Sequence, residues 1–154
     1  MASYVTTIVW KRGFGENFTD NRFSRAHGWF FDGGIEITAS SSPHIVPVPM
    51  SKEAAVDPEE AFIAAIASCH MLWFLSFAAG KGLIVESYID HAEGGLSKND
   101  CGMLAITDVT LRPAVLFGPT KSPSPSQIDE LHNLAHEKCF IANSVKTTIR
   151  IVPQ

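Results

Sequence analysis

The chain has 154 residues, of which 45% are hydrophobic, and its formal net charge is −4. A chain of this length buries about two thirds of its unfolded surface on folding, so it needs no disulfide bonds to hold a core together. The negative net charge and the lack of any basic block argue against a protein that binds nucleic acid or acidic membranes. We therefore expect one domain over residues 1–154, with no nucleic acid and no membrane among its partners.

The first forty residues predict a β-rich segment. Residues 4–10, 24–31 and 34–39 alternate in polarity or are rich in β-formers, and residues 32–34 (DGG) are typical of a hairpin turn. No apolar stretch follows the basic residues near the N-terminus, so no signal peptide is predicted. Together with a count of three cysteines, this favours a reducing cytoplasm, where reactive thiols deserve more attention than structural disulfides.

Residues 57–82 (DPEEAFIAAIASCHMLWFLSFAAGKG) predict a long helix. Asp57 is a suitable N-cap and Glu60 completes a capping box, while two glycines mark the end. The nineteen uncharged residues 61–79 are apolar on all faces and long enough to span a bilayer. Because a Ser-Cys-His triplet lies in the middle and the surrounding sequence is strand-like, we expect a helix buried in the protein instead.

The remaining sequence predicts strands, a second helix and a last strand. Residues 83–93 and 102–111 are predicted to pair, and residues 118–126 form an extended connection rich in proline and serine. Ser124 repeats the capping pattern at the start of a helix that ends at about Cys139. The segment SVKTTIRIV then closes the chain as a strand. This order predicts an α+β fold, with antiparallel sheets packed around the long helix.

Candidate catalytic residues lie on both predicted helices. Cys69 is inside the long helix, Glu59 is at its start, and Cys139 is at the end of the second helix. Taken singly, a helical cysteine is usually a small buried hydrophobe, and a glutamate in a first turn usually stabilises the helix dipole. The combination with arginines near the N-terminus is more specific. A reactive thiol needs a cation to hold its thiolate, and a buried cation needs an acid to hold it.

The segment DPEEAFIAAIASCH, followed by AHEKCFIANSVKTTI, resembles the two cysteine motifs of the OsmC/Ohr family, the organic hydroperoxide reductases. The segment FTDNRFSRAHGWFFDGG resembles the N-terminal strand region of an OsmC-like subgroup. The resemblance spans nearly the whole chain. It implies an OsmC-like α+β fold with a long buried central helix, and an intertwined homodimer with the site at its interface.

The resemblance also implies a role for each candidate residue. Cys69 is expected to attack the peroxide, Cys139 to resolve the oxidised thiol, and Glu59 to position an arginine. Arg25 fits that arginine best by its distance from the predicted turn, and Arg22 is the alternative. Ten residues of straight helix rise by about 15 Å, so Glu59 cannot touch Cys69. Either the helix breaks between them or the long arginine bridges part of the gap.

A thiol-dependent peroxidase of this kind needs no cofactor and no metal. The Cys69 thiolate attacks ROOH and becomes a sulfenic acid, Cys139 condenses with it to a disulfide, and an external dithiol restores both thiols. The resemblance suggests a lipoyl-type dithiol as that reductant. Aromatic residues in the motifs favour an organic hydroperoxide over hydrogen peroxide. They are Phe62, Trp73, Phe74 and Phe140.

Two other classes of function fit parts of the same sequence. His132, His136 and Cys139 fall at i, i+4 and i+7 of the second helix and could bind a soft metal with Cys69 as a fourth ligand. Alternatively, the protein is a non-catalytic module that binds a hydrophobic ligand, with Cys69 lining its pocket. The third cysteine, Cys101, follows a loop-like segment and is expected to take no part in either chemistry.

Overall fold

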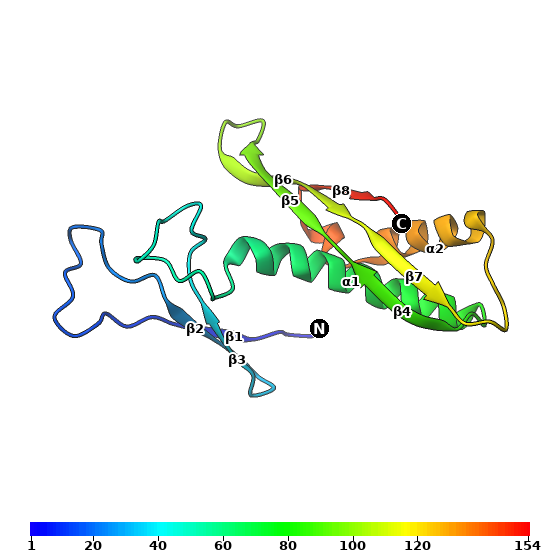
Figure 1. The fold of residues 1–154 in the computed structure, drawn as a ribbon, viewed down its shortest axis with the longest axis horizontal. Coiled ribbons are helices and arrows are strands. Elements are labelled where there is room, and N and C mark those ends of the chain that lie inside the picture. The colour runs from blue at the N-terminus through cyan, green and yellow to red at the C-terminus, as the bar shows by residue number, and fades with distance from the viewer. The chain divides into compact units, whose positions relative to one another are not determined.

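The computed structural model describes residues 1–154, and its internal contacts divide the chain into two units, Met1–Ala61 and Phe62–Gln154. Helix α1 (Pro58–Gly80) begins at the end of the first unit and continues through the second without interruption (Figure 1). Asp57 and Glu60 form the predicted capping box, since each side chain accepts a hydrogen bond from the other residue's backbone N–H. Because α1 is continuous from Pro58 to Gly80, the alternative in which it breaks between Glu59 and Cys69 is wrong.

The first unit is built on a three-stranded antiparallel sheet in the order β1-β2-β3. Its strands are β1 (Thr6–Val9), β2 (His27–Phe31) and β3 (Glu36–Ala39). The three predicted strands are confirmed, although each is shorter than its sequence pattern. The hairpin turn between β2 and β3 is also confirmed, and Gly34 adopts a φ of 82° there, a conformation that favours glycine.

The second unit holds most of α1, five strands and a second helix. Its strands are β4 (Val85–Asp90), β5 (Glu93–Lys98), β6 (Leu104–Leu111), β7 (Pro113–Phe117) and β8 (Thr148–Ile151). Helix α2 (Pro125–Lys138) and the 3-10 turn η1 (Ala142–Ser144) precede β8. The capping box predicted at Ser124 is confirmed, because its hydroxyl accepts from Gln127 N while the Gln127 side chain accepts from Ser124 N.

Strand pairing in the second unit differs from the prediction in two ways. Residues 83–93 are not one strand that pairs with 102–111, because β4 pairs with β7 and β5 pairs with β6, both antiparallel. Local pattern gave no strand at β7, which begins with proline and finds its partner more than twenty residues back. Strand β8 pairs with β6 in parallel, although antiparallel sheets were expected. Parallel neighbours require a crossover, which β7 and α2 provide.

Helix α1 contributes one stripe of four buried residues to two cores. Phe74 and Ala78 pack with Leu131 and Ala135 of α2, against partly buried residues of β4 and β7. Ile66 packs with Val109 and Leu111 against β6 and β8. The fourth member of the stripe, His70, is also buried.

We expected α1 to be buried on every side, but the single chain buries only this stripe. The Leu72 side chain, for example, is 60% exposed. Helix α1 is long and apolar enough to cross a membrane by length and composition alone. Its buried stripe instead packs against sheets and α2, as in the core helix of a globular protein.

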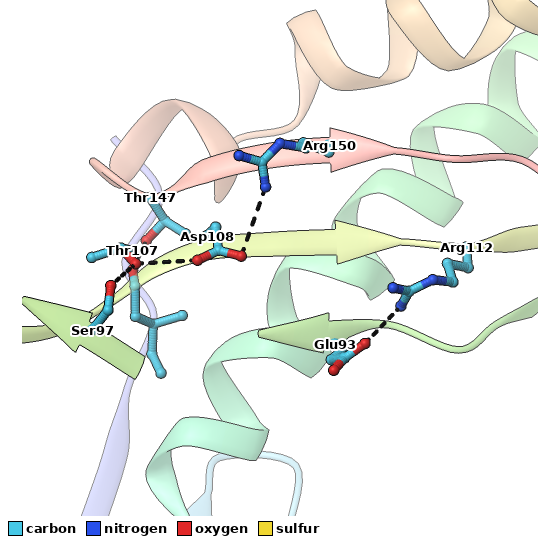
Figure 2. Close-up of polar contacts among 8 residues, drawn as sticks. Glu93, Ser97, Thr107, Asp108, Arg112, Thr147 and Arg150 are labelled. Atoms are coloured by element: carbon cyan, nitrogen blue, oxygen red, sulfur yellow. Dashed lines mark hydrogen bonds and ion pairs between the residues drawn. The ribbon is translucent and has the colours of Figure 1, made fainter. Parts of the chain in front are cut away.

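Polar side chains gather on the β5-β6-β8 sheet, and Figure 2 shows the contacts among them. Asp108 of β6 forms an ion pair with Arg150 of β8 at 3.7 Å and accepts a hydrogen bond from the Thr107 hydroxyl. Arg112 contacts Glu93 at 3.0 Å. Both ion pairs are partly exposed, and such pairs contribute about 0–1 kcal/mol each. This face is a solvated surface and positions none of the predicted site residues.

Candidate functional site

The second unit brings the two predicted redox cysteines together. Cys69 lies in the middle of α1, and Cys139 is the C-cap of α2, seventy positions later in the chain. The two thiols are close enough that Cys69 raises the pKa of Cys139, and both are free. This proximity could not be derived from helix periodicity, because it depends on how α1 and α2 pack. A disulfide between them requires their Cβ atoms to be about 3.5–4.5 Å apart.

The two thiols have unequal environments. Cys139 is only 1% exposed, whereas Cys69 is half-buried. Burial, reinforced by the hydrogen bond to Cys69, raises the pKa of the Cys139 thiol to about 11. The backbone N–H of Ala142 donates to Cys139 Sγ at 3.4 Å, and this hydrogen bond partly lowers the pKa of the thiol. At neutral pH Cys139 is therefore a protonated thiol, and Cys69 has the better access to solvent.

Aromatic rings adjoin the thiol pair along both helices. Trp73, one helical turn after Cys69, makes an edge contact with Phe140, the residue after Cys139, at 5.5 Å between centroids. Trp73 also stacks on Phe77 at 5.5 Å. The Phe140 side chain is 67% exposed, so the aromatic group extends from the helix contact to the surface. This arrangement offers an apolar surface beside the more accessible thiol.

Two buried histidines, His70 of α1 and His132 of α2, form a contact that the sequence did not predict, since it suggested His132 only as a metal ligand. His70 Nε2 and His132 Nδ1 are 3.0 Å apart, and their rings are nearly parallel, with 7° between the planes. Their side chains are 1% and 3% exposed. Burial lowers the pKa of each histidine to about 4, helped for His70 by the neighbouring His132 and His136 and opposed for His132 by Asp129. Both imidazoles are neutral at pH 7, so a single hydrogen joins them.

The metal-site alternative is not supported by this geometry. No group of three or more histidine, cysteine, aspartate or glutamate side chains is placed to hold a metal ion. His132, the first of the predicted ligands, faces His70. The i, i+4 and i+7 spacing placed His132, His136 and Cys139 near one face of α2, but spacing on one helix does not decide what the facing helix presents.

The predicted charged residues lie in the first unit. Arg25 stacks over the Phe23 ring at 3.6 Å, and its guanidinium donates to Asn21 Oδ1 at 2.8 Å and to the Phe23 carbonyl. No ion pair joins Arg25 to Glu59. Arg22, the alternative arginine, is exposed. Glu59 Oε2 is buried and has no hydrogen-bond partner. Arg25 is thus held by contacts with its neighbours in sequence, and the buried Oε2 of Glu59 can still accept a hydrogen bond.

A cavity in the second unit is lined by none of these residues. Its volume is about 490 Å³, and it is lined by residues 97–101, 105–107 and 146–148. Cys101 is in this lining, exposed in the β5–β6 turn, as its loop-like sequence predicted. Neither Cys69 nor Cys139 lines this cavity, so the cavity is not the site of the predicted thiol chemistry.

Comparison with known proteins gives one consistent family. The family model described as OsmC-like protein matches residues 51–153. An OsmC-like protein of unknown function from Vibrio cholerae is 55% identical, with a TM-score of 0.99 over 100% of both chains. A search among curated proteins finds no match.

Two organic hydroperoxide resistance proteins share the fold at lower identity. The one from Bacillus subtilis is 18% identical, with a TM-score of 0.69 over 98% of each chain. The one from Elizabethkingia anophelis is 14% identical, with a TM-score of 0.70 over 99% of this chain and 94% of its own. The predicted family and the α+β fold class are thus confirmed.

Proposed function

Because the chain belongs to the OsmC family, we propose that it is a thiol-dependent peroxidase that reduces organic hydroperoxides to alcohols. The observation that carries this proposal is the contact between Cys69 and Cys139 across two helices, with unequal burial of the two thiols. The more accessible Cys69 thiol suits an attacking cysteine, and the buried, protonated Cys139 thiol suits a resolving one.

The proposed cycle has three balanced steps. The Cys69 thiolate attacks the terminal oxygen of ROOH, the O–O bond breaks, and RO⁻ takes a proton to leave as ROH. The Cys139 sulfur then attacks the sulfenic sulfur, and water leaves as the Cys69–Cys139 disulfide forms. An external dithiol, proposed to be of lipoyl type, reduces the disulfide by thiol exchange and is itself oxidised.

Magnitudes indicate that thiol acidity contributes little to the rate. For a thiol in general, lowering the pKa from about 8.5 to about 6 raises the thiolate fraction at pH 7 roughly 30-fold. A Brønsted slope near 0.45 removes about 13-fold of intrinsic nucleophilicity, so the net gain is about twofold. Most of the acceleration must therefore come from orienting the peroxide and stabilising charge on the departing oxygen.

We assign that orienting role to Arg25, held by Glu59, with Arg22 as the alternative. A guanidinium can contact a carboxylate and a peroxide oxygen at once, because its donors form a planar fork. The buried Oε2 of Glu59 lacks a partner, as expected of a carboxylate that receives an arginine when the site assembles. The proposal therefore requires Arg25 to leave its contacts with Asn21 and Phe23.

The proposed substrate is apolar and the proposed assembly is a homodimer in the cytoplasm. Trp73 and Phe140 form an apolar surface next to the thiols, which favours an organic hydroperoxide. Leu72 of α1 is 60% exposed and Phe140 is 67% exposed in the single chain, which fits burial shared with a second copy.

The test is consumption of cumene hydroperoxide by the purified full-length chain with a dithiol reductant. Intact mass after one equivalent of peroxide should fall by about 2 Da in the wild type, as a disulfide requires. In Cys139→Ser it should rise by about 16 Da, because the sulfenic acid has no partner, and sustained turnover should be lost if the reductant attacks only the disulfide. Absence of consumption in the wild type would refute the proposal and favour the alternative of a hydrophobic-ligand-binding module.

A further inference from the structure

The histidine pair is the least expected feature of the second unit. Besides the single bond between His70 and His132, each ring has a second nitrogen that is buried without a partner, namely His70 Nδ1 and His132 Nε2. His136 Nδ1 is buried and unpartnered as well. Buried polar atoms without partners cost free energy, and apolar side chains of similar volume would avoid that cost. The pair therefore calls for a role other than stabilising the core.

The place of the pair in the fold suggests that role. His70 directly follows Cys69 on α1, and His132 is two turns before Cys139 on α2. The hydrogen bond between them therefore joins the same two helices that bring the thiols together. The contact of Trp73 with Phe140 joins the two sulfur-bearing segments a second time.

Disulfide chemistry is sensitive to such a constraint. An S–S bond is about 2.05 Å long and needs Cβ atoms about 3.5–4.5 Å apart, with a narrow range of dihedral angles. Apolar contacts between helices tolerate sliding, whereas a hydrogen bond between two ring nitrogens holds over a few tenths of an ångström. A single buried polar pair that fixes the register of packed helices is the best-attested use of such groups.

We propose that His70 and His132 are positioning residues, whose hydrogen bond fixes the register of α1 against α2 so that Cys139 can close on the oxidised Cys69. This inference deepens the proposed function, since it concerns the second step of the cycle. Both rings are buried, so we assign the pair no contact with the substrate. Its loss should slow disulfide closure and leave the first attack unchanged, because that attack needs only Cys69, the peroxide and the arginine.

Two amide substitutions at His132 make a matched pair. The asparagine side chain places its polar atoms near the position of Nδ1, which makes the bond to His70, whereas glutamine extends toward the position of Nε2. Both are neutral amides that differ by one methylene. His132→Asn should therefore keep the helix register, and His132→Gln should lose it. His91→Leu, at an exposed histidine between β4 and β5, is the control for removing an imidazole elsewhere.

The measurement is the equilibrium of the two thiols with oxidised and reduced glutathione, which gives their effective concentration without any peroxide. We expect His132→Gln to lower it at least tenfold, and His132→Asn and His91→Leu to stay within threefold of the wild type. With cumene hydroperoxide, His132→Gln should form the sulfenic acid at a rate within twofold of the wild type and close the disulfide at least tenfold more slowly.

Equal effective concentrations in His132→Gln and His132→Asn would overturn the positioning role, as would equal slowing of both chemical steps. The glutathione measurement separates the two proposals. If the wild type consumes no hydroperoxide but His132→Gln still lowers the effective concentration, the proposed peroxidase function fails while the register function of the pair stands.

Discussion

The proposed site has two halves, the thiol pair of Cys69 and Cys139 and the charged pair of Arg25 and Glu59. In the single chain the residues of the first pair are close together, whereas those of the second pair form no ion pair. Cys69 and Cys139 already lie close together within the second unit, where the packing of α1 on α2 brings them near enough for Cys69 to raise the pKa of Cys139. Arg25 and Glu59 belong to the first unit, and Arg25 is engaged with Asn21 and Phe23 instead of the carboxylate. In the proposed cycle, disulfide formation therefore involves residues of one unit alone, whereas peroxide activation requires Arg25 of the other unit to leave its present contacts.

The largest expected effect tests the thiol half. Cys69→Ser should abolish hydroperoxide turnover, because the hydroxyl is nearly isosteric but is not ionised near pH 7. The fold should persist, which circular dichroism and thermal melting can check. Wild-type consumption of cumene hydroperoxide by this variant would exclude Cys69 as the attacking group.

The next effect tests the charged half alone. Arg25→Lys keeps the positive charge but loses the planar fork, so we expect kcat/KM to fall at least tenfold. The effective concentration of the two thiols against glutathione should not change, since Arg25 lies outside the unit that holds them. If Arg22→Lys is damaging and Arg25→Lys is neutral, Arg22 is the active-site arginine and the mechanism stands.

A smaller effect is expected on acid stability. The folded pKa of His70 and of His132 is about 4, below the ordinary value of 6.5, so the unfolded chain binds more protons between these values. The free energy of unfolding should therefore fall as the pH drops from about 6.5 to about 4, by up to ~3 kcal/mol per histidine. Urea titrations across this range measure it.

His132→Asn supplies the reference for that measurement, because it removes one titrating group and keeps the hydrogen-bonding atom at the same depth. The variant should lose less stability than the wild type on acidification. An identical pH slope in both proteins would contradict the assignment of two buried neutral imidazoles.

The smallest effect is expected at the third cysteine. Cys101 is exposed in the β5–β6 turn and is not part of the thiol contact. Cys101→Ser should therefore match the wild type in turnover and should still lose about 2 Da with one equivalent of peroxide. Failure of this variant to form the disulfide, with Cys139→Ser still forming it, would move the resolving role to Cys101.

Local signals predicted the helices well. The capping boxes at Asp57 and Ser124 are readable within four residues of sequence, and both are present in the structure. Sheet pairing was harder, because the partner of a strand is chosen by packing across the fold. Thus β7, which begins with Pro113, was missed, and β8 was not expected to run parallel to β6.

The same division holds within the site. Resemblance to the OsmC/Ohr motifs singled out Cys69 and Cys139, and the structure brings these two residues together. The bond between His70 and His132 joins residues 62 positions apart, and helix periodicity does not reveal which rings face each other. An apolar helix also gives no sign of which of its faces its own chain covers, and the single chain leaves residues of α1 such as Leu72 exposed.

The parallel pairing of β8 with β6 also bears on how the chain folds. Residues 112–147, including all of α2, lie between these two strands, so their pairing must close a long loop before it is rewarded by contacts. Cys139 lies inside that loop, and Cys69 is synthesised seventy residues earlier. We expect amide hydrogen exchange during refolding to protect β8 after the β5–β6 hairpin, and protection in the reverse order would contradict this. Until α2 packs on α1, Cys69 is a thiol without its partner, so we expect a newly made chain to be most vulnerable to irreversible oxidation before these two helices meet.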